Sequence, residues 1–314
     1  MSDPAAVADL LRDQARRTTT RSELERRHPD LDQASPTVGV LDEAAVAGAH
    51  AHDPDAAVDL LADLARATDP ALRAKARRLA VRLLVPPPRA GDADRRGASR
   101  LATVTGEGLD LDLDATLEAQ LGRTDPHRAP REEDLRWRTW RSPARAVVLL
   151  VDASGSVAGA PLTTAATTAG ALAAGTRGED ELAVVAFWSR AVVLRHLRSP
   201  APPEAVLDAL FDLRGGSTTD LALGLRTALA QATGARAPRT EIVVLTDGAW
   251  NEGEDPVPVA GAAAGSGARV HTLVTVDSEE ARTACGRLAS AGGGRSVPLL
   301  RPSAAPEAVR ALLR

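Results

Sequence analysis

The sequence predicts an α/β protein with a doubly wound, mostly parallel sheet that has one antiparallel edge strand and follows an α-helical N-terminal region. Two observations predict this fold class. After residue 142, short apolar runs alternate with helical patterns, as in parallel sheets whose strands are connected by helices. Before residue 89 the patterns are helical only. We therefore expect a helical region at residues 1–88, a connector at 89–142 and an α/β domain at 143–314.

The α/β pattern begins with Ala146–Val151, a continuous apolar run of the kind found in central parallel strands that are buried on both faces. Leu182–Phe187 is the next strand, and Ala191–Leu194 follows too soon for a crossover helix, so these two runs predict an antiparallel hairpin. The other expected strands are Glu241–Thr246, Arg269–Val276 and Ser296–Leu299. The expected helices are Val157–Ala174, Pro203–Phe211, Leu221–Ala232, Val257–Ala264, Glu279–Ala289 and Pro306–Leu313.

In the helical region, the Asp69-Pro70 pair combines an N-cap residue with proline at the first helical position. A helix is expected from Pro70 to Leu84, and the prolines at 86–88 end it. Two more helices are expected, at Ala5–Arg17 and Asp55–Ala67.

In the connector, Asp114 is expected to cap a short helix that ends at Leu121. Leu135–Arg141 then alternates around Trp137, which predicts an added edge strand or an extended strap. Its arginines would face water and protect the edge from further pairing. Because aromatic residues among basic ones are also typical of single-stranded nucleic-acid binding, contact with RNA is the alternative.

Composition narrows the class of protein. The formal net charge is -4, so there is no overall basic field to attract nucleic acid. A single cysteine, Cys285, excludes a disulfide framework and a cysteine-cluster zinc site, and we expect it to be a buried thiol. No apolar run reaches the ~20 residues of a membrane span, and the N-terminus lacks signal-peptide features. A cytoplasmic protein is expected.

Three polar clusters fall where strands of the α/β domain end. Asp152, Ser154 and Ser156 follow the first strand, Gly215–Asp220 leads into a helix, and Thr246–Gly248 follows the third long strand. In an open α/β sheet, ligands bind at the carboxyl ends of the parallel strands. We therefore expect the three clusters to converge.

The clusters offer carboxylate and hydroxyl oxygens, without histidine or thiolate. Such a set suits a hard cation, Mg²⁺ first and then Mn²⁺ or Ca²⁺. Gly155 would let the first loop turn sharply between its hydroxyl residues. Because hydroxyls are neutral, the ion would keep positions for water or for a partner's carboxylate.

The pattern Asp152-x-Ser154-x-Ser156, a downstream threonine before a helix and a later Thr-Asp-Gly resemble the metal-ion-dependent adhesion site of von Willebrand factor A (VWA) domains, over about residues 145–314. The resemblance assigns metal binding, directly or through water, to Asp152, Ser154, Ser156, Thr219 and Asp247. Thr219 is chosen because it begins the family's Thr-Asp-Leu-x-x-Gly pattern, and Thr218 is the competing choice. Asp220 is expected to cap the following helix.

Other chemistries are less well supported by the sequence. There is no GxxxxGK[ST] phosphate loop, no GxSxG and no GxGxxG motif. No histidine lies near the three loops in sequence, so we expect no enzyme. His196 and His271 are expected to be incidental strand or strand-edge residues, and His50 and His52 are expected in a solvated loop before a helix.

The resemblance implies a binding module whose metal ion captures an Asp or Glu of a partner protein. The helical N-terminal region and the late position of the domain are similar to cytoplasmic VWA proteins that work with AAA+ ATPases of the MoxR or magnesium-chelatase type in metal insertion or client maturation. Trp250, just beyond Asp247, is expected either at the rim of the site as an anchor for the partner or in the core. The alternatives are an RNA-associated VWA protein and a metal-dependent hydrolase.

Overall fold

The computed structural model describes residues 18–85, 100–105, 110–123, 131–141, 143–155, 160–177, 179–202, 205–213 and 216–313. They belong to two compact units, one formed by Met1–Pro87 with Ala144–Leu313 and the other by Pro88–Pro143. The helix expected at Ala5–Arg17 lies outside the described residues. None of the helices in the described ranges is long and apolar enough to cross a membrane.

A six-stranded sheet forms the centre of the first unit, in the order β6-β5-β4-β7-β8-β9. The pairs β4–β5, β4–β7, β7–β8 and β8–β9 are parallel, and only β5–β6 is antiparallel. The strands are β4 (Arg145–Asp152), β5 (Glu181–Phe187), β6 (Ala191–Arg195), β7 (Arg239–Thr246), β8 (Ala268–Val274) and β9 (Gly293–Pro298). The predicted fold class, with one antiparallel edge strand, is confirmed.

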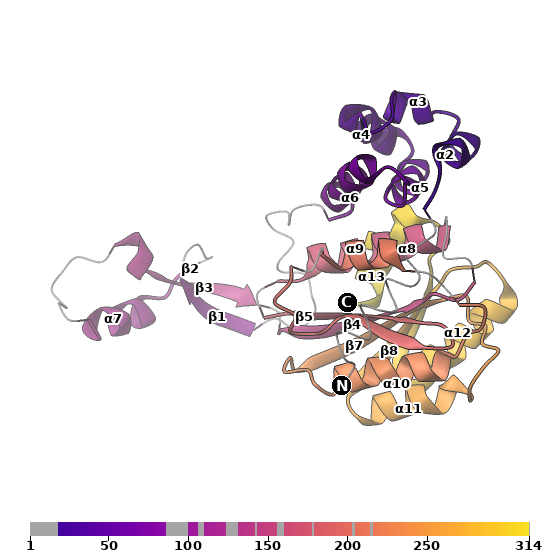
Figure 1. The fold of residues 1–314 in the computed structure, drawn as a ribbon. Coiled ribbons are helices and arrows are strands. Elements are labelled where there is room, and N and C mark those ends of the chain that lie inside the picture. The colour runs from indigo at the N-terminus through magenta and orange to yellow at the C-terminus, as the bar shows by residue number, and fades with distance from the viewer. Residues whose placement is uncertain are drawn as a thin grey trace. The chain divides into compact units, whose positions relative to one another are not determined.

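Helices cover both faces of this sheet, because β4 is apolar on both sides (Figure 1). Val147, Leu149 and Val151 belong to one core cluster, and Val148 and Leu150 to the other, as the alternation of side chains along a strand requires. The first face carries α8 (Ala160–Gly175), α9 (Val206–Asp212) and α13 (Ala305–Leu312). The second carries α10 (Leu221–Ala232), α11 (Pro256–Gly265) and α12 (Glu279–Ala291).

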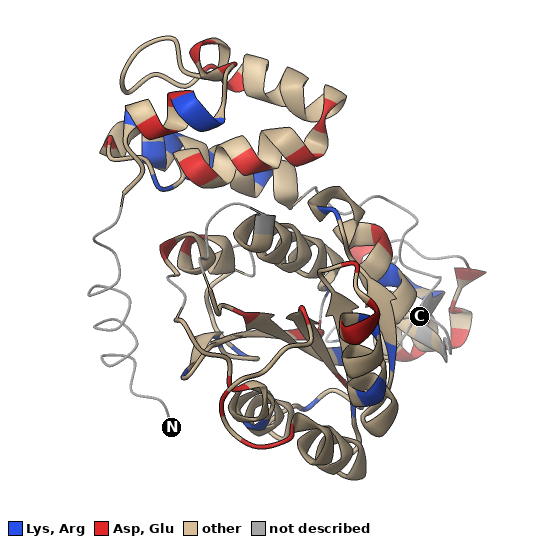
Figure 2. Ribbon diagram, turned by 90° about the vertical axis from the view of Figure 1, so that its right-hand side faces the viewer, with Lys and Arg blue, Asp and Glu red and all other residues tan. Residues whose placement is uncertain are grey.

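The N-terminal helices of this unit are α2 (Arg21–Arg27), α3 (Leu31–Ala34), α4 (Glu43–His52), α5 (Pro54–Leu64) and α6 (Pro70–Leu84). Acidic and basic residues are intermixed along them (Figure 2). The placement of His50 and His52 in a loop was wrong, because both lie in the last turn of α4. This helix forms because Asp42 caps it through the Ala44 and Ala45 amides and because its sequence is rich in alanine.

The N-terminal helices share a core with the first face of the sheet. Buried Arg66, just after α5, donates to the carbonyls of Phe211 and Leu213 at 3.1 and 2.6 Å, where α9 ends. A Cβ on Gly170 of α8 would lie 2.5 Å from the Leu84 carbonyl oxygen, so α6 and α8 approach closely. The helices and the α/β layers are therefore one packed body.

The second unit contains a three-stranded antiparallel sheet in the order β1-β3-β2. Its strands are β1 (Arg100–Thr105), β2 (Asp110–Leu111) and β3 (Arg136–Arg141), with helix α7 (Leu113–Leu121) between β2 and β3 in sequence. The stretch predicted to be an edge strand or strap is the central strand, because β1 and β2 pair with its two edges. The predicted cap was also wrong: Asp112, and not Asp114, caps α7 by accepting from the Ala115 amide.

Candidate metal centre

The first loop of the candidate site begins where β4 ends, at Asp152. This half-buried carboxylate accepts a hydrogen bond from the Ser154 amide at 2.9 Å through Oδ1, and one from the Thr246 hydroxyl at 2.9 Å through Oδ2. Thr246 is the last residue of β7, which lies beside β4. Two neighbouring strand ends therefore fix the orientation of Asp152.

The second loop lies directly against the first. Ser154 and Gly216 form a parallel β-bridge, and the Gly155 amide donates to the Gly216 carbonyl at 2.6 Å. Gly155 has a φ of 74°, which confirms the predicted sharp turn at a position that favours glycine. Ser156 lies outside the described residues.

Thr219 is buried, whereas the competing Thr218 is partly exposed. The Thr219 amide donates to the side-chain oxygen of Asn251 at 2.8 Å, and the Thr219 carbonyl accepts from the Asn251 amide at 3.2 Å. Asp220 accepts from the Leu223 amide at 2.8 Å and caps α10, as expected. Asn251 thus links the second loop to the third, a role that the sequence pattern did not reveal.

The third loop turns sharply after Thr246. The Thr246 hydroxyl accepts from the Gly248 amide at 3.1 Å, and Gly248 has a φ of 82°. Asp247 is exposed and accepts from the Ala249 amide at 2.9 Å through Oδ1. Asp247 therefore stands at the open side of the site, with its carboxylate available to a ligand.

The charges of the site are uncompensated. Burial raises the pKa of Asp152, and the negative charge of Asp247 raises it further, against hydrogen bonds from Ser154 and Thr246 that lower it. Within the described part of the chain, neither carboxylate forms an ion pair with Arg, Lys or His. Two carboxylates and neighbouring hydroxyls, without a protein cation, fit a hard divalent ion. The described residues also contain no group of three His, Cys, Asp or Glu side chains that could hold a metal, so the hydroxyls would have to contribute.

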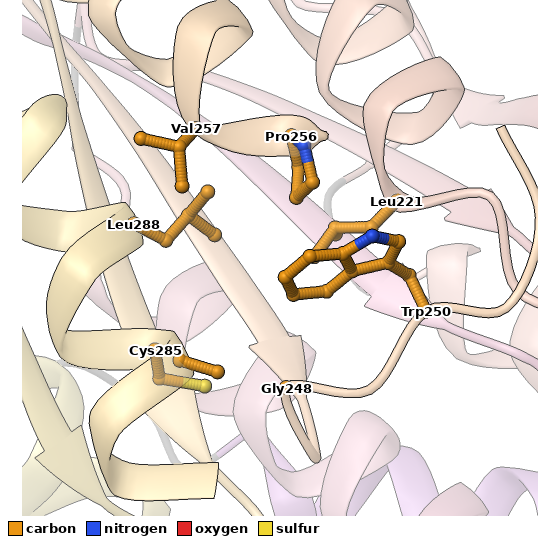
Figure 3. A pocket seen from close by; sticks show the side chains of 8 residues that line it. Leu221, Gly248, Trp250, Pro256, Val257, Cys285 and Leu288 are labelled. Carbon is orange, nitrogen blue, oxygen red and sulfur yellow. The ribbon is translucent and has the colours of Figure 1, made fainter. Parts of the chain in front are cut away.

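An apolar pocket lies behind the third loop (Figure 3). Trp250 is partly buried and packs against the second-face core, beside Leu221 and Pro256. Cys285 of α12 lies close to Gly248, where an added Cβ would be 3.0 Å from the Cys285 sulfur. Burial, followed by the charge of Asp247, raises the pKa of Cys285 to about 12, so the predicted buried thiol is confirmed. The third loop therefore packs against α12.

The pocket is lined by Leu221, Gly248, Trp250, Pro256, Val257, Ala284, Cys285 and Leu288.

Comparison with known proteins identifies the family. Residues 76–306 match the family model of VWA domain containing CoxE-like protein. The chain belongs to this family. The match includes most of α6 and the whole second unit, as well as nearly all of the α/β layers. The VWA domain that the strand-end motifs suggested is thereby confirmed.

Solved structures similar to this CoxE-like chain include an aerotolerance-related membrane protein from Bacteroides fragilis, at 18% identity and a TM-score of 0.43, covering 54% of this chain and 98% of the other. BatB from Bacteroides thetaiotaomicron has 18% identity and a TM-score of 0.40, covering 53% and 95%. Proximal thread matrix protein 1 from the mussel byssus has 16% identity and a TM-score of 0.46, covering 55% and 46%. No curated protein matches the chain.

Proposed function

We propose that this CoxE-like chain is a metal-dependent adaptor that captures an acidic side chain of a partner protein. The observation that carries the proposal is the junction of three loops, two at strand ends and one leading into α10, around two uncompensated carboxylates, Asp152 and Asp247. The metal would be Mg²⁺, with Mn²⁺ or Ca²⁺ as alternatives, because all the candidate ligands are oxygens. We assign the ligands to Asp152, Ser154, Ser156, Thr219 and Asp247.

Each described residue has a separate task in this proposal. Asp152 is held by Ser154 and Thr246, so its carboxylate is oriented before any ion arrives. The loop of Thr219 is held by Asn251, while Asp247 stays exposed to solvent. A bound divalent ion would supply a positive charge with positions left for a carboxylate from outside. A partner's Asp or Glu is the group that complements such a site.

We propose binding and not catalysis. Hydrolysis beside a metal ion needs a general base or a nucleophile close to it. Among the described hydrogen bonds of Asp152 and Asp247, every partner is a backbone amide or a hydroxyl. Both groups are poor bases at neutral pH, and the proposal assigns the two carboxylates to the metal, so no described group is left to act as the base.

The biological setting is also a proposal. The CoxE-like family is associated with maturation of CO dehydrogenase. We infer that the chain works in the cytoplasm with a separate AAA+ ATPase of the MoxR type in client maturation or metal insertion. We propose a protein and not an RNA as the partner; in the arginine-rich strand, Arg138 pairs at 3.2 Å with Asp112, the N-cap residue of α7.

Isothermal titration with Mg²⁺ tests the metal site in wild type, in Asp152→Asn and in the matched control Asp30→Asn. Asp30 is exposed and its side chain caps no helix. We expect one site in wild type and in the control, and an affinity at least about tenfold lower in Asp152→Asn because a charged ligand is lost. Equal binding in all three proteins would show that Asp152 holds no metal.

Affinity capture then tests the adaptor role, with Mg²⁺ or EDTA present during the wash. A partner retained by wild type and Asp30→Asn in Mg²⁺, and lost with EDTA or in Asp152→Asn, supports capture through the ion. Partners that are indifferent to both treatments would contradict it, even if the metal itself binds.

A further inference from the structure

Helix α7 of the second unit buries its polar face and exposes its apolar face, which is the reverse of an ordinary amphipathic helix. Its polar residues Thr116 and Gln120, and the capping Asp112, are buried. Leu113, Leu117 and Leu121 are 62%, 59% and 73% exposed. A helix at a protein surface normally buries its apolar stripe and exposes its polar face. Here the apolar stripe has no partner within the described residues.

Polar contacts with β1 and β3 fix this orientation. The Asp112 carboxylate accepts from Thr103 at 2.6 Å and from Arg138 at 3.2 Å, and the Asp112 amide donates to the Arg136 carbonyl at 2.8 Å. The Thr116 hydroxyl accepts from the Arg136 amide at 2.9 Å. Rotating α7 to bury its leucines would break these bonds. The leucines are therefore exposed because hydrogen bonds hold α7 in this orientation, and not because the helix is weakly attached.

The exposed face has a definite chemistry. Leu113, Leu117 and Leu121 are four residues apart, so they form one stripe along the helix. Asp114 and Glu118 are exposed beside this stripe, and the α7 sequence LDATLEAQL contains no basic residue. A complementary surface would be an apolar stripe bordered by positive charge.

We propose that α7 is a docking surface for an amphipathic helix of a partner protein whose apolar face is bordered by Lys or Arg. Two helices would bury the leucines between them, and the basic side chains would pair with Asp114 and Glu118. A second copy of this chain is a poorer occupant, because two α7 helices side by side would bring their carboxylates together. The surface lies in a different unit from the metal centre and does not depend on it.

Fluorescence anisotropy with the full chain in EDTA tests this surface without involving the metal. The probes are two labelled amphipathic peptides of about 18 residues, long enough to form helix. They carry the same leucine stripe, and it is bordered by Lys in one and by Glu in the other. We expect the Lys peptide to bind at least about tenfold more tightly than the Glu peptide.

Variants identify the surface. Leu117→Ser should weaken binding of the Lys peptide at least about tenfold, because it removes the centre of the stripe. Val38→Ser, which changes a 69% exposed side chain in the first unit, should leave binding unchanged. The double variant Asp114→Lys/Glu118→Lys should reverse the preference toward the Glu peptide. Because all these side chains are exposed, circular dichroism should show the same helix content in every variant.

Three results would overturn the proposal. Both peptides could bind wild type equally, Leu117→Ser could bind the Lys peptide as well as wild type does, or the charge reversal could have no effect. Sedimentation equilibrium supplies a further check. A dimer that Leu117→Ser dissociates would make a second copy the occupant and would also refute the basic partner helix.

Discussion

Gly216 is the position at which the smallest change should disturb the candidate metal centre. Its carbonyl accepts from the Gly155 amide, and its backbone bridges Ser154, so it sets the spacing of the first two loops. A Cβ at this position would lie 2.2 Å from Cδ1 of the Trp188 ring. We predict that Gly216→Ala separates these loops and weakens Mg²⁺ binding.

The size of the effect follows from this overlap. Two carbon atoms in contact prefer at least about 3.5 Å, so either the ring or the loop must move by about 1.3 Å. Trp188 is only 5% exposed, and its carbonyl accepts from the Asp220 amide, so the ring has little room to retreat. Overpacking of this kind costs about 1–3 kcal/mol. If separation of the two loops relieves half of an overpacking cost of about 3 kcal/mol, Mg²⁺ must restore that strain to bring the ligands together. The Mg²⁺ affinity then falls roughly tenfold.

Urea unfolding and Mg²⁺ titration measure the two consequences in the same protein. Gly286→Ala is the matched control, because it makes the same substitution in α12 with no atom within 4 Å of the new Cβ. That control should gain about 0.5–1 kcal/mol of stability, since glycine disfavours a helix interior, and should bind Mg²⁺ as wild type does. Wild-type stability and Mg²⁺ affinity in Gly216→Ala would refute the reasoning, because the loop would then be free to shift.

Three further changes have expected outcomes. Thr246→Val removes a hydrogen bond that lowers the pKa of Asp152, so Mg²⁺ titrations should show weaker binding that declines more steeply as the pH falls; an unchanged pH profile would contradict this. Burial raises the pKa of Glu241, but hydrogen bonds from His271 and an arginine outweigh burial and leave the pKa lowered. The Glu241 carboxylate therefore stabilises the fold above its ordinary pKa of 4.5. This contribution to stability is lost as the pH falls through the lowered pKa. Urea unfolding between pH 6 and pH 3 (roughly the carboxylate range) should therefore show a shallower decline for Glu241→Gln, and an equal slope would count against the assignment. Cys285, with its pKa raised to about 12, should resist a thiol reagent near pH 8 (about the ordinary thiol range) until urea unfolds the protein, so rapid labelling of the native chain would show that the pocket opens.

The central layers could be predicted because their signal is local. A run such as Ala146–Val151 is apolar on both faces only if helices cover both sides of the strand, and the structure extends this strand to Arg145–Asp152. The short gap before Ala191 likewise allowed only an antiparallel return. Strand ends were less certain: β9 begins at Gly293 and not at Ser296, because two glycines and an arginine carry no alternation.

The second unit was not predictable in the same way. Its strand β3 pairs Val104 with Trp137 and Leu111 with the same tryptophan, and such distant pairings leave no local pattern in a sequence. A short helix ending at Leu121 was predicted, but the outward orientation of its leucines was not, for a related reason. Sequence patterns assign a leucine stripe to the core, whereas here Asp112 and Thr116 bind β3 and turn that stripe outward.

The candidate metal centre shows the same division between local and distant information. The polar clusters were expected to converge because ligands bind where the strands of an open α/β sheet end, and the resemblance to VWA domains assigned Asp152, Thr219 and Asp247 as ligands. The residues that orient them, Thr246 and Asn251, act across more than thirty residues of chain, and a motif cannot indicate that pairing. The chemical type of the candidate ligands can therefore be predicted from short sequence motifs, whereas their geometry depends on tertiary contacts.

This division bears on how the proposed adaptor role could evolve in this family. The family match spans both units, so the candidate metal centre and α7 lie within one family region. Yet the metal loops depend on contacts within the first unit, and α7 depends on β3 within the second. Substitutions such as Leu117→Ser should therefore change one proposed binding surface without altering the internal contacts of the other. An adaptor that must hold two proteins needs this independence, because either partner could then diverge without loss of the other contact.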